Sequence, residues 1–302
     1  MELIQSSEEQ FTTIPDYPFS PNFVAIKDRD SGSDMRMHYV DEGRADHPLV
    51  LLLHGEPSWS FLYRKMIPLL VQAGYRVIAP DLIGFGKSDK ILERDYYTYA
   101  RHIEWMTDFV DRLGLTSINL FCQDWGGLIG LRLVAATPHL FASVVTSNTF
   151  LPTGADEPSE AFLKWQSFSQ SVPEFPTGKI IQGATVSTLT EAEVYAYDAP
   201  YAEEAHKAGA RQFPTLVPTS LDNPESENNQ KAWEVLQTFT NPWLCLFGDS
   251  DPVTKGADQF IMKMVPGCQG QPHKIMEKGG HFIQEDCGPA LVEMMVSWYR
   301  CF

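Results

Sequence analysis

Residues 120–127 read Leu-Phe-Cys-Gln-Asp-Trp-Gly-Gly, a short apolar run followed by a polar, glycine-rich turn. This pattern is typical of a strand that passes through a sharp turn into a helix and lifts the turn residue above a sheet. The turn residue is usually a serine, whereas this chain carries Asp124. A carboxylate attacks carbon to give an ester, whereas a serine alkoxide attacks an acyl group. The stretch therefore indicates an α/β sheet and displacement at an alkyl carbon.

Strand-like and helix-like segments alternate along the first half of the chain. The run 48–53 is uniformly apolar, which predicts a strand buried on both faces, as in a parallel sheet. Two alternating stretches before it, 23–26 and 35–40, predict an opening antiparallel hairpin. The segments that follow are expected to be a helix over 59–71, a strand over 75–79, a helix over 97–113, a strand over 117–121, and a helix that begins at Gly126 and Gly127.

This alternation is interrupted once. After a strand expected over 142–147, residues 150–228 are rich in Pro and acidic residues and contain no strand to continue the sheet. We therefore predict an α/β fold with a mostly parallel eight-stranded sheet, helices on both faces and an inserted helical cap. The core domain comprises 1–149 and 229–302, and the cap domain 150–228. The remaining elements are expected to be cap helices over 160–168 and 190–196, strands over 243–247 and 274–276, and a final amphipathic helix over 289–299.

Acidic residues and a histidine follow three of the expected strands. Asp124 stands on the turn, Asp249 and Asp251 follow the next to last strand, and His281 follows the last. Ligands on open α/β sheets bind at the carboxyl ends of the strands, where these groups can converge. The order nucleophile, acid, histidine is that of a catalytic triad on such a sheet. Of the two acids Asp251 is preferred, because the acid usually lies three residues beyond the glycine that ends the strand, here Gly248, and Asp249 is then a turn residue.

The turn after the first buried strand reads His54-Gly55-Glu56-Pro57. In folds of this kind a backbone N–H from this loop and one from the residue after the nucleophile form an oxyanion hole, here Glu56 and Trp125. Such a hole implies a carbonyl attacked by water, which in this chain is the carbonyl of an Asp124 ester. His54 is expected to hydrogen-bond backbone groups and to shape the loop.

These motifs together resemble a known family, the haloalkane dehalogenases of the α/β-hydrolase superfamily, and within it subfamily I. The resemblance covers nearly the whole chain. Cys122 stands where esterases have the first glycine of the turn, a position that varies among dehalogenases. The patterns that carry the resemblance are His-Gly-Glu-Pro at 54–57, Gln-Asp-Trp-Gly-Gly at 123–127, and the cap segments Leu189-Thr-Glu-Ala-Glu and Ala208-Gly-Ala-Arg-Gln-Phe-Pro.

The resemblance implies a reaction, the hydrolysis of haloalkanes to a primary alcohol, halide and a proton. Asp124 forms a covalent alkyl ester, and water activated by His281 hydrolyses it, with Asp251 orienting the histidine. Indole N–H groups suit the departing halide, because they donate hydrogen bonds without competing as nucleophiles. By the same resemblance Trp125 is one such donor and Trp165, in the cap, is the second. Phe162 lies one helical turn before Trp165 and is expected to line the substrate pocket.

An epoxide hydrolase is the nearest alternative, because it uses the same aspartate and the same tryptophan after it. Its chemistry needs cap tyrosines to protonate the opening ring, and Tyr195, Tyr197 and Tyr201 are candidates. Against it, Glu56 stands where epoxide hydrolases carry an aromatic residue, and Trp165 suits a halide better than an epoxide oxygen.

Two further classes fit less well. A fluoroacetate-type dehalogenase has an arginine after its nucleophile to bind a carboxylate, and this chain has Trp125 there. A non-enzymatic binding protein of this fold is expected to lose a member of the triad, and none is missing from the sequence.

Charge and composition narrow the partners. The 302-residue chain carries a formal net charge of −16, which argues against nucleic acid or an anionic membrane and fits a small neutral halogenated alkane, with water and halide ion. No apolar run approaches the ~20 residues that span a bilayer, and the first residues lack a signal peptide, so a cytoplasmic protein is expected. Residues 84–88 end like a phosphate loop but lack its first glycine, and no Cys and His ligands cluster, so neither a cofactor nor a metal is expected.

The five cysteines show no CxxC pairing, and their odd number favours reduced thiols over a disulfide framework. Cys301 is the exception, because a thiol there is a candidate for an intermolecular disulfide. The chain is accordingly expected to be a monomer, or a homodimer linked through that thiol.

Overall fold

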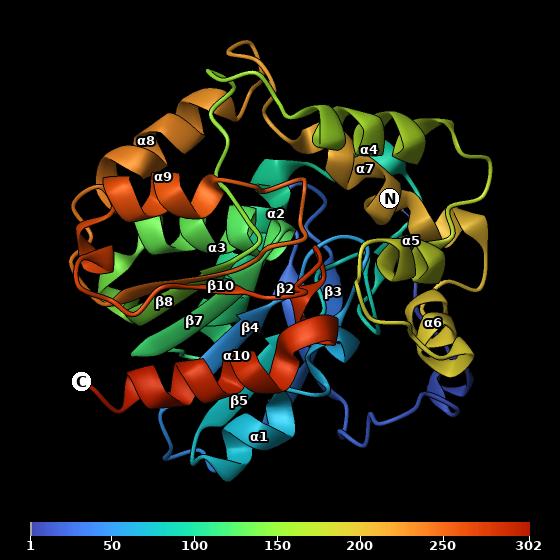
Figure 1. Cartoon of the computed structure of the whole chain (residues 1–302). Coiled ribbons are helices and arrows are strands. Elements are labelled where there is room, and N and C mark those ends of the chain that lie inside the picture. Colours follow the sequence, from blue (N-terminus) through green and yellow to red (C-terminus); the bar gives the residue numbers. More distant parts are fainter. Residues whose placement is uncertain (1) are drawn as a thin grey trace.

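The expected strands form one sheet of eight in the order β10-β9-β8-β7-β4-β5-β3-β2 (Figure 1). The structure is a computed structural model of the chain, and it describes residues 2–302. Neighbouring strands from β10 to β5 run parallel, whereas β5 with β3 and β3 with β2 are antiparallel. The predicted mostly parallel eight-stranded sheet is therefore confirmed. The strands are β2 (Asn22–Lys27), β3 (Asp34–Glu42), β4 (Leu49–Leu53), β5 (Arg76–Pro80), β7 (Ile118–Gln123), β8 (Phe141–Ser147), β9 (Trp243–Gly248) and β10 (Lys274–Met276), and β1 (Leu3–Ile4) pairs with β6 (Lys90–Ile91) outside this sheet.

Helices cover both faces of the sheet, as expected. The helices are α1 (Ile67–Gln72), α2 (Tyr99–Arg112), α3 (Trp125–Ala136), α4 (Glu160–Ser171), α5 (Thr177–Gly183), α6 (Glu191–Asp198), α7 (Ala208–Leu216), α8 (Ser226–Leu236), α9 (Ala257–Met264) and α10 (Ile283–Tyr299). Short 3₁₀ segments are η1 (Glu8–Phe11), η2 (Ser60–Tyr63), η3 (Arg94–Tyr96), η4 (Pro138–Leu140), η5 (Glu204–Lys207) and η6 (Pro266–Cys268).

The central strand β4 shows why its sequence is apolar throughout. All of its side chains are buried, and they alternate between the two faces of the sheet. Leu51 and Leu53 pack into the core layer that contains α2 and α3, whereas Val50 and Leu52 pack into the layer that contains α1 and α10. A strand with an apolar layer on each side has no position for a polar side chain.

Two predicted helices differ from the structure by more than the few residues seen at the ends of the others, and each contains a proline. The helix expected over 59–71 is divided into η2 and α1, because Pro68 lacks the N–H that a continuous helix would donate to the Arg64 carbonyl. The last helix begins at Ile283, six residues before the predicted start, and runs through Pro289. The Glu285 carbonyl that Pro289 leaves without its helical partner accepts instead from Lys65 Nζ at 3.2 Å.

The inserted region contains helices α4 to α7, which lie together beyond one end of the sheet, on the right of Figure 1. Serine and threonine begin two of them: the Ser159 side chain accepts from the Phe162 N–H before α4, and Thr190 with Glu193 forms a capping box before α6. Helix α8 packs against α3 instead. The predicted boundary at 228/229 falls within α8, which spans Ser226–Leu236. The division into core and cap domains at 149/150 and 228/229 stays a prediction.

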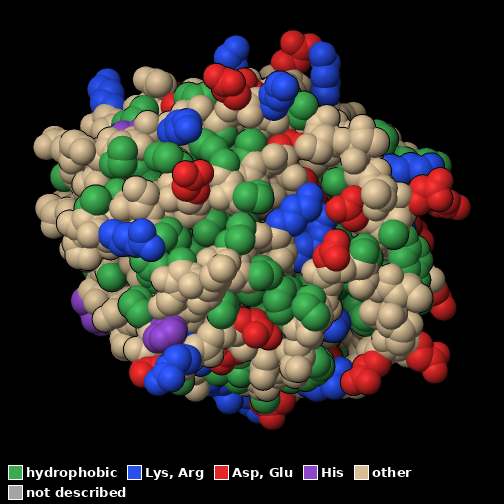
Figure 2. Space-filling model, turned by 60° about the horizontal axis from the view of Figure 1, so that its bottom comes forward, with side chains coloured by type: hydrophobic (Ala, Val, Ile, Leu, Met, Phe, Trp, Pro, Cys, Tyr) green, Lys and Arg blue, Asp and Glu red, His purple; other side chains and the backbone are tan. Residues whose placement is uncertain are grey.

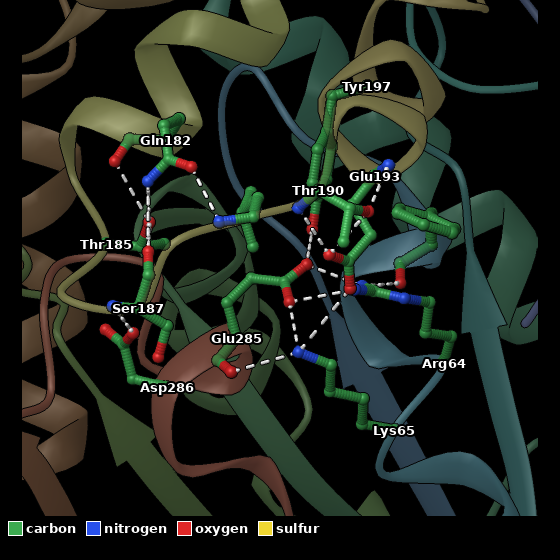
Figure 3. A network of polar contacts seen from close by, with 12 residues as sticks. Arg64, Lys65, Gln182, Thr185, Ser187, Thr190, Glu193, Tyr197, Glu285 and Asp286 are labelled. Atoms are coloured by element: carbon green, nitrogen blue, oxygen red, sulfur yellow. Dashed lines mark hydrogen bonds and ion pairs between the residues drawn. The ribbon is translucent and has the colours of Figure 1, made fainter. Parts of the chain in front are cut away.

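A buried ion network joins α6 to α10 (Figure 3). Arg64 donates to Glu285 at 2.5 and 2.9 Å and to Glu193 at 2.6 Å. Lys65 Nζ lies 2.7 Å from Glu285 Oε2, and the Tyr197 hydroxyl donates to the same carboxylate. The side chains of Arg64 and Glu285 are fully buried, and two cations face two anions, so the buried charges are balanced.

The surface carries charges of both signs. On the face seen in Figure 2, acidic and basic side chains are dispersed among apolar and other groups. Within residues 2–302, no helix combines the length and the apolar character needed to cross a membrane.

Candidate active site

Asp124 stands at the junction of β7 and α3 in a conformation that few residues with a side chain adopt, with φ of 51° and ψ of −128°. Helix α3 lies close to the sheet there, because a Cβ on Gly126 would come within 2.0 Å of the Leu53 carbonyl oxygen. The Asp124 N–H donates to the Asn148 carbonyl at 3.0 Å, and the Asp124 carbonyl accepts from the Thr149 hydroxyl at 2.7 Å. These contacts hold the carboxylate at the carboxyl end of the sheet.

The loop after β4 reaches the same carboxylate. The Glu56 N–H donates to Asp124 Oδ1 at 2.7 Å, and a Cβ on Gly55 would come within 2.2 Å of that oxygen. Trp125 is the first residue of α3, so its N–H is one of those that a helix leaves without an internal partner. Of the two backbone groups expected to form an oxyanion hole, the Glu56 N–H therefore contacts the Asp124 carboxylate, and the Trp125 N–H belongs to the residue that follows Asp124.

The Glu56 and His54 side chains are both buried beside this loop. Burial, and then the charge of Asp124, raise the pKa of Glu56 well above its ordinary value, which favours a neutral carboxyl group next to the carboxylate. Burial lowers the pKa of His54. Its Nε2 accepts from the Leu82 N–H at 3.0 Å and its Nδ1 lies 2.9 Å from the Gly55 carbonyl, so the ring is bound to backbone groups on both sides.

His281 lies between two carboxylates. Its Nε2 is 3.3 Å from Asp124 Oδ2, and its Nδ1 is 3.0 Å from Asp251 Oδ2. Asp251 also accepts from the Val253 N–H at 2.9 Å and from the Thr254 hydroxyl at 2.5 Å. The structure thus places Asp251 beside the histidine.

Asp249, the other acid considered, is exposed and accepts from the hydroxyl of its neighbour Ser250 at 2.7 Å. It therefore lies in the turn and does not contact His281.

These contacts shift two titrations in opposite directions. Burial raises the pKa of a carboxyl group, but the charge and hydrogen bond of His281 outweigh it and lower the pKa of Asp251 to about 2. Burial lowers the pKa of a histidine, but Asp251 and Asp124 outweigh it and raise the pKa of His281 well above its ordinary value. His281 is therefore protonated over a wider pH range than a histidine in water.

Two amide side chains that were not among the predicted site residues hold the His281 backbone. Asn148 Nδ2 donates to the carbonyls of Gly280 at 2.7 Å and His281 at 3.1 Å, and its Oδ1 accepts from the Gly248 N–H at 2.8 Å. Gln123 Nε2 donates to the His281 carbonyl at 3.0 Å. A detectable signal was present, since both amides directly follow or end a buried strand, where solvent cannot supply their partners.

A cavity of about 680 Å³ opens beside these groups. Trp125, Trp165 and Phe162 line it together with Asp124 and His281, so that the structure brings the predicted cap and core residues to one space. Such a volume is in the usual range for small-molecule sites, ~300–1,000 Å³. Most of the remaining wall is apolar, with Leu128, Phe150, Ile180, Val217, Phe260 and Phe282 among its side chains.

The two tryptophans of the cavity differ from the other five. Trp125 is buried and stacks on Phe213 with ring centroids 4.4 Å apart, and Trp165 is partly buried. Within residues 2–302 no protein acceptor is bonded to the indole N–H of either. The other five indoles donate to protein atoms, namely those of Trp59, Trp105, Trp233, Trp243 and Trp298.

The tyrosines considered for ring opening lie elsewhere. Tyr195 is exposed, the Tyr197 hydroxyl is bonded to Glu285, and Tyr201 is buried. In the part of the chain that the structure describes, no tyrosine lines the cavity, and no three His, Cys, Asp or Glu side chains are grouped to hold a metal ion.

Comparison with known proteins agrees with this architecture. Residues 48–286 match the family model of the alpha/beta hydrolase fold, and the open sheet with polar groups at its strand ends defines a protein of that class. A haloalkane dehalogenase of Psychrobacter cryohalolentis is 52% identical over 298 residues, which cover 99% of this chain and 98% of that protein. One from Mycobacterium marinum is 44% identical over 99% of this chain and 100% of that protein. The chain belongs to the haloalkane dehalogenases.

A solved structure supports the same assignment. The haloalkane dehalogenase of Paraglaciecola agarilytica NO2, described as tetrameric, superposes with a TM-score of 0.90 at 32% identity and covers 100% of this chain and 99% of its own. The family resemblance expected from the sequence is thereby confirmed, as is the enzyme class.

Proposed function

We propose that this enzyme converts small neutral haloalkanes to a primary alcohol, halide and a proton through a covalent ester on Asp124. The observation that carries the proposal is that the Asp124 carboxylate shares an apolar cavity with the only two indole N–H groups in residues 2–302 that have no protein acceptor. A carboxylate can displace a leaving group at an alkyl carbon, and unpaired N–H donors can bind the halide that departs.

In the first half of the reaction, Asp124 attacks the carbon that bears the halogen. The Glu56 N–H binds Oδ1 at 2.7 Å, so the attacking atom is Oδ2, which lies 3.3 Å from His281 Nε2. A lone pair of Oδ2 forms the new carbon–oxygen bond while the carbon–halogen bond breaks and the halide leaves with its electron pair. The N–H groups of Trp125 and Trp165 bind that halide, and Phe162 contributes to the apolar wall around the alkyl group.

In the second half, His281 Nε2 removes a proton from water and the hydroxide attacks the ester carbonyl carbon of Asp124. The N–H groups of Glu56 and Trp125 stabilise the oxyanion. Collapse of the tetrahedral intermediate expels the alkoxide, which takes the proton back from His281 and leaves as the alcohol. The regenerated Asp124 carboxyl group then loses one proton, so that one water is consumed for each halide and proton released.

Ester formation also prepares the base for this step. In the free enzyme Asp251 and Asp124 together raise the pKa of His281. The ester carries no charge, so the pKa of His281 falls once Asp124 is alkylated. The imidazolium then releases its proton to solvent, the neutral imidazole accepts one from water, and at the end of the cycle the Asp124 carboxyl group returns a proton to His281. Asp251 keeps the ring oriented through Nδ1 at 3.0 Å.

Epoxide hydrolysis, the alternative with the same nucleophile, gains no support from the cap. Its ring-opening acid has to reach the epoxide oxygen, and none of Tyr195, Tyr197 and Tyr201 lines the cavity. A side-by-side assay separates the two activities. We expect halide release from dibromoethane or a short chloroalkane and no diol from styrene oxide, whereas diol formation without halide release would contradict the proposal.

The covalent step has its own test. His281→Gln removes the base but leaves the nucleophile, so we expect a stable alkyl adduct on Asp124 after incubation with dibromoethane, detected by mass spectrometry of peptides. An adduct on another residue, or none, would overturn the mechanism. Asp124→Asn serves as the control and is expected to give no adduct.

We also propose that the protein is cytoplasmic. All five cysteines are free thiols, as a reducing cytoplasm would keep them, and Cys301 is exposed. We propose a monomer that can dimerise through Cys301 under oxidising conditions. Elution volume measured with and without reductant, beside Cys301→Ser, tests this, and an assembly that both conditions leave unchanged would point to a non-covalent interface.

A further inference from the structure

One carboxylate on the first turn of α10 joins the His281 loop to the cap. Asp286 Oδ2 accepts from the Gly280 N–H at 2.8 Å and from the Val186 N–H at 3.1 Å, and Oδ1 accepts from the Ser187 N–H at 2.7 Å. Gly280 directly precedes His281, whereas Val186 and Ser187 belong to the loop between α5 and α6. Figure 3 shows Asp286 beside Ser187, on the other side of Glu285 from the Arg64 network.

The two loops that Asp286 joins are also in direct backbone contact. The Phe282 N–H donates to the Ala184 carbonyl at 3.4 Å. A Cβ on Gly280 would lie 2.6 Å from the Ala184 oxygen and 3.0 Å from Thr185 Cα. Only glycine fits there without displacing the cap loop, so the cap backbone rests directly on the residue before the histidine.

The residue that precedes His281 is therefore held at both of its backbone polar groups. Asn148 binds the Gly280 carbonyl at 2.7 Å and Asp286 binds the Gly280 N–H at 2.8 Å. The carbonyl is held by the core alone, whereas the group that holds the N–H also binds the cap. Ala184, Thr185 and Val186 line the cavity, so the same carboxylate connects the cavity wall to the histidine.

We propose that Asp286 is a positioning residue, which fixes His281 by binding the Gly280 N–H and the cap loop in one cluster. The inference rests on the proposed function, in which His281 acts only after the ester has formed. A displaced histidine then slows ester hydrolysis and leaves alkylation of Asp124 unchanged. Loss of an anchor that only stabilises the fold does not produce this division between the two steps.

The experiment uses two variants that disturb the contact from opposite sides. Asp286→Asn keeps the shape of the side chain but replaces one acceptor oxygen with an NH₂ group, and Gly280→Ala forces the Ala184 carbonyl away. Rapid mixing with dibromoethane, acid quenching and mass spectrometry give the bromide burst and the amount of adduct on Asp124. We expect an unchanged burst and ester hydrolysis slowed about tenfold or more, because misplacing a catalytic group by about 1 Å can cost on the order of 100-fold. The values of kcat and KM fall together, since the ester accumulates.

Two control variants separate this inference from its premises. Asp198→Asn removes the same kind of carboxylate within the cap, where Oδ1 accepts from the Gly178 N–H at 2.9 Å, and is expected to lower stability without accumulation of adduct. His281→Gln reports on the proposed function itself: if it forms no adduct on Asp124, that function fails. If it does form the adduct while Asp286→Asn and Gly280→Ala slow both steps equally, or accumulate no more adduct than Asp198→Asn, Asp286 is not a positioning residue.

Discussion

At the scale of single residues, the conformation of Asp124 is strained and its neighbours stabilise it. A residue with a side chain at positive φ costs ~1–3 kcal/mol. Compensation comes from the backbone bond to Asn148, the Thr149 hydroxyl and the Glu56 N–H, the last of which binds the carboxylate itself. The strain is thus coupled to the contact that, in the proposed mechanism, stabilises the oxyanion.

The two unpaired indoles allow a prediction about halide binding. Trp125→Phe and Trp165→Phe each remove one N–H donor, and a hydrogen bond to a charged group contributes ~1.5–3 kcal/mol. Since ~1.4 kcal/mol is tenfold, we expect product inhibition by bromide to weaken by about tenfold or more in each variant. Trp233→Phe is the matched control, because that indole already donates to the Leu151 carbonyl at 2.8 Å. Equal inhibition constants in all three variants would contradict the halide role.

The raised pKa of His281 leads to a prediction about pH. Asp251 and Asp124 raise it in the free enzyme, and only Asp251 acts on it in the ester. Ester hydrolysis, followed in single turnovers, should therefore lose rate with falling pH at a lower pH than the one at which His281 titrates in the free enzyme by NMR. Coincident midpoints would mean that the Asp124 charge does not control the base.

The same shift makes stability depend on pH. A pKa raised in the folded state means that the ion pairs of His281 stabilise the fold fully below its unfolded value, ordinarily ~6.5, and that this contribution is lost as pH rises through the folded value. The free energy of unfolding is thus expected to decline across that window in the parent enzyme, and less so in His281→Gln.

At the scale of the elements, apolar runs predicted the strands well, because a strand buried on both faces has no other composition. Strand β4 illustrates this, since each of its side chains packs into one of two apolar layers. Helix boundaries near proline were harder to predict. Helix α10 runs through Pro289, and the Glu285 carbonyl that this proline frees is bound by Lys65, far away in the sequence. No local pattern contains that partner.

The candidate site likewise has a part that the sequence predicts and a part that it does not. Asp124, Asp251 and His281 follow strands, so the sequence predicted that they could meet, and the structure places them together. The groups that hold their backbones, such as Asn148 and Asp286, bind peptide atoms of distant loops. Any Asn or Asp can do so, and only the packing of the cap on the sheet decides which one does.

A glycine in α3 tests how closely helix and sheet have to approach. Gly126→Ala places a Cβ 2.0 Å from the Leu53 carbonyl oxygen, and overpacking of this kind costs ~1–3 kcal/mol. We expect lower stability to urea and a lower kcat, since displacement of α3 also moves the Trp125 N–H. Gly183→Ala is the control in a helix, where a Cβ meets no atom within 4 Å and Ala favours the helix. Equal stability of the two variants would contradict the close approach.

At the scale of the whole molecule, the cap is attached unevenly. Helix α6 is tied to α10 by the buried network of Arg64 and Glu285, and the loop before it by Asp286. Helix α4, which carries Trp165, has no ion pair with another element in residues 2–302 and is attached by hydrogen bonds such as those from Gln166 to the Pro214 carbonyl at 2.8 Å and from Arg211 to the Ser169 carbonyl at 3.2 Å. The wall of the cavity next to His281 is therefore the firmly held one, and the wall with the second indole has fewer charged anchors.

The buried network makes the last prediction. Arg64→Met leaves Glu285 buried with fewer partners, and Glu285→Leu leaves Glu193 as the only carboxylate bonded to Arg64, so each single change should destabilise the fold by ~3–5 kcal/mol. The double variant replaces both charges by apolar groups and is expected to be more stable than the sum of the single losses predicts, with a coupling of ~0.5–3 kcal/mol. Urea unfolding of the four proteins measures this coupling.

The effect of salt on the coupling distinguishes this buried network from an ion pair on the surface. Because the side chains of Arg64 and Glu285 are fully buried, the coupling should change little between low and high ionic strength. The pair of Lys164 with Glu160 on α4 is the control, since 75% and 82% of these side chains are exposed and salt should abolish its small contribution. Additive losses, or a coupling that salt removes, would contradict a buried charge pair between Arg64 and Glu285. The attachment of α6 would then rest on its other contacts, such as that of Tyr197 with Phe61 and the hydrogen bond from the Trp59 indole to the Ala196 carbonyl at 3.0 Å.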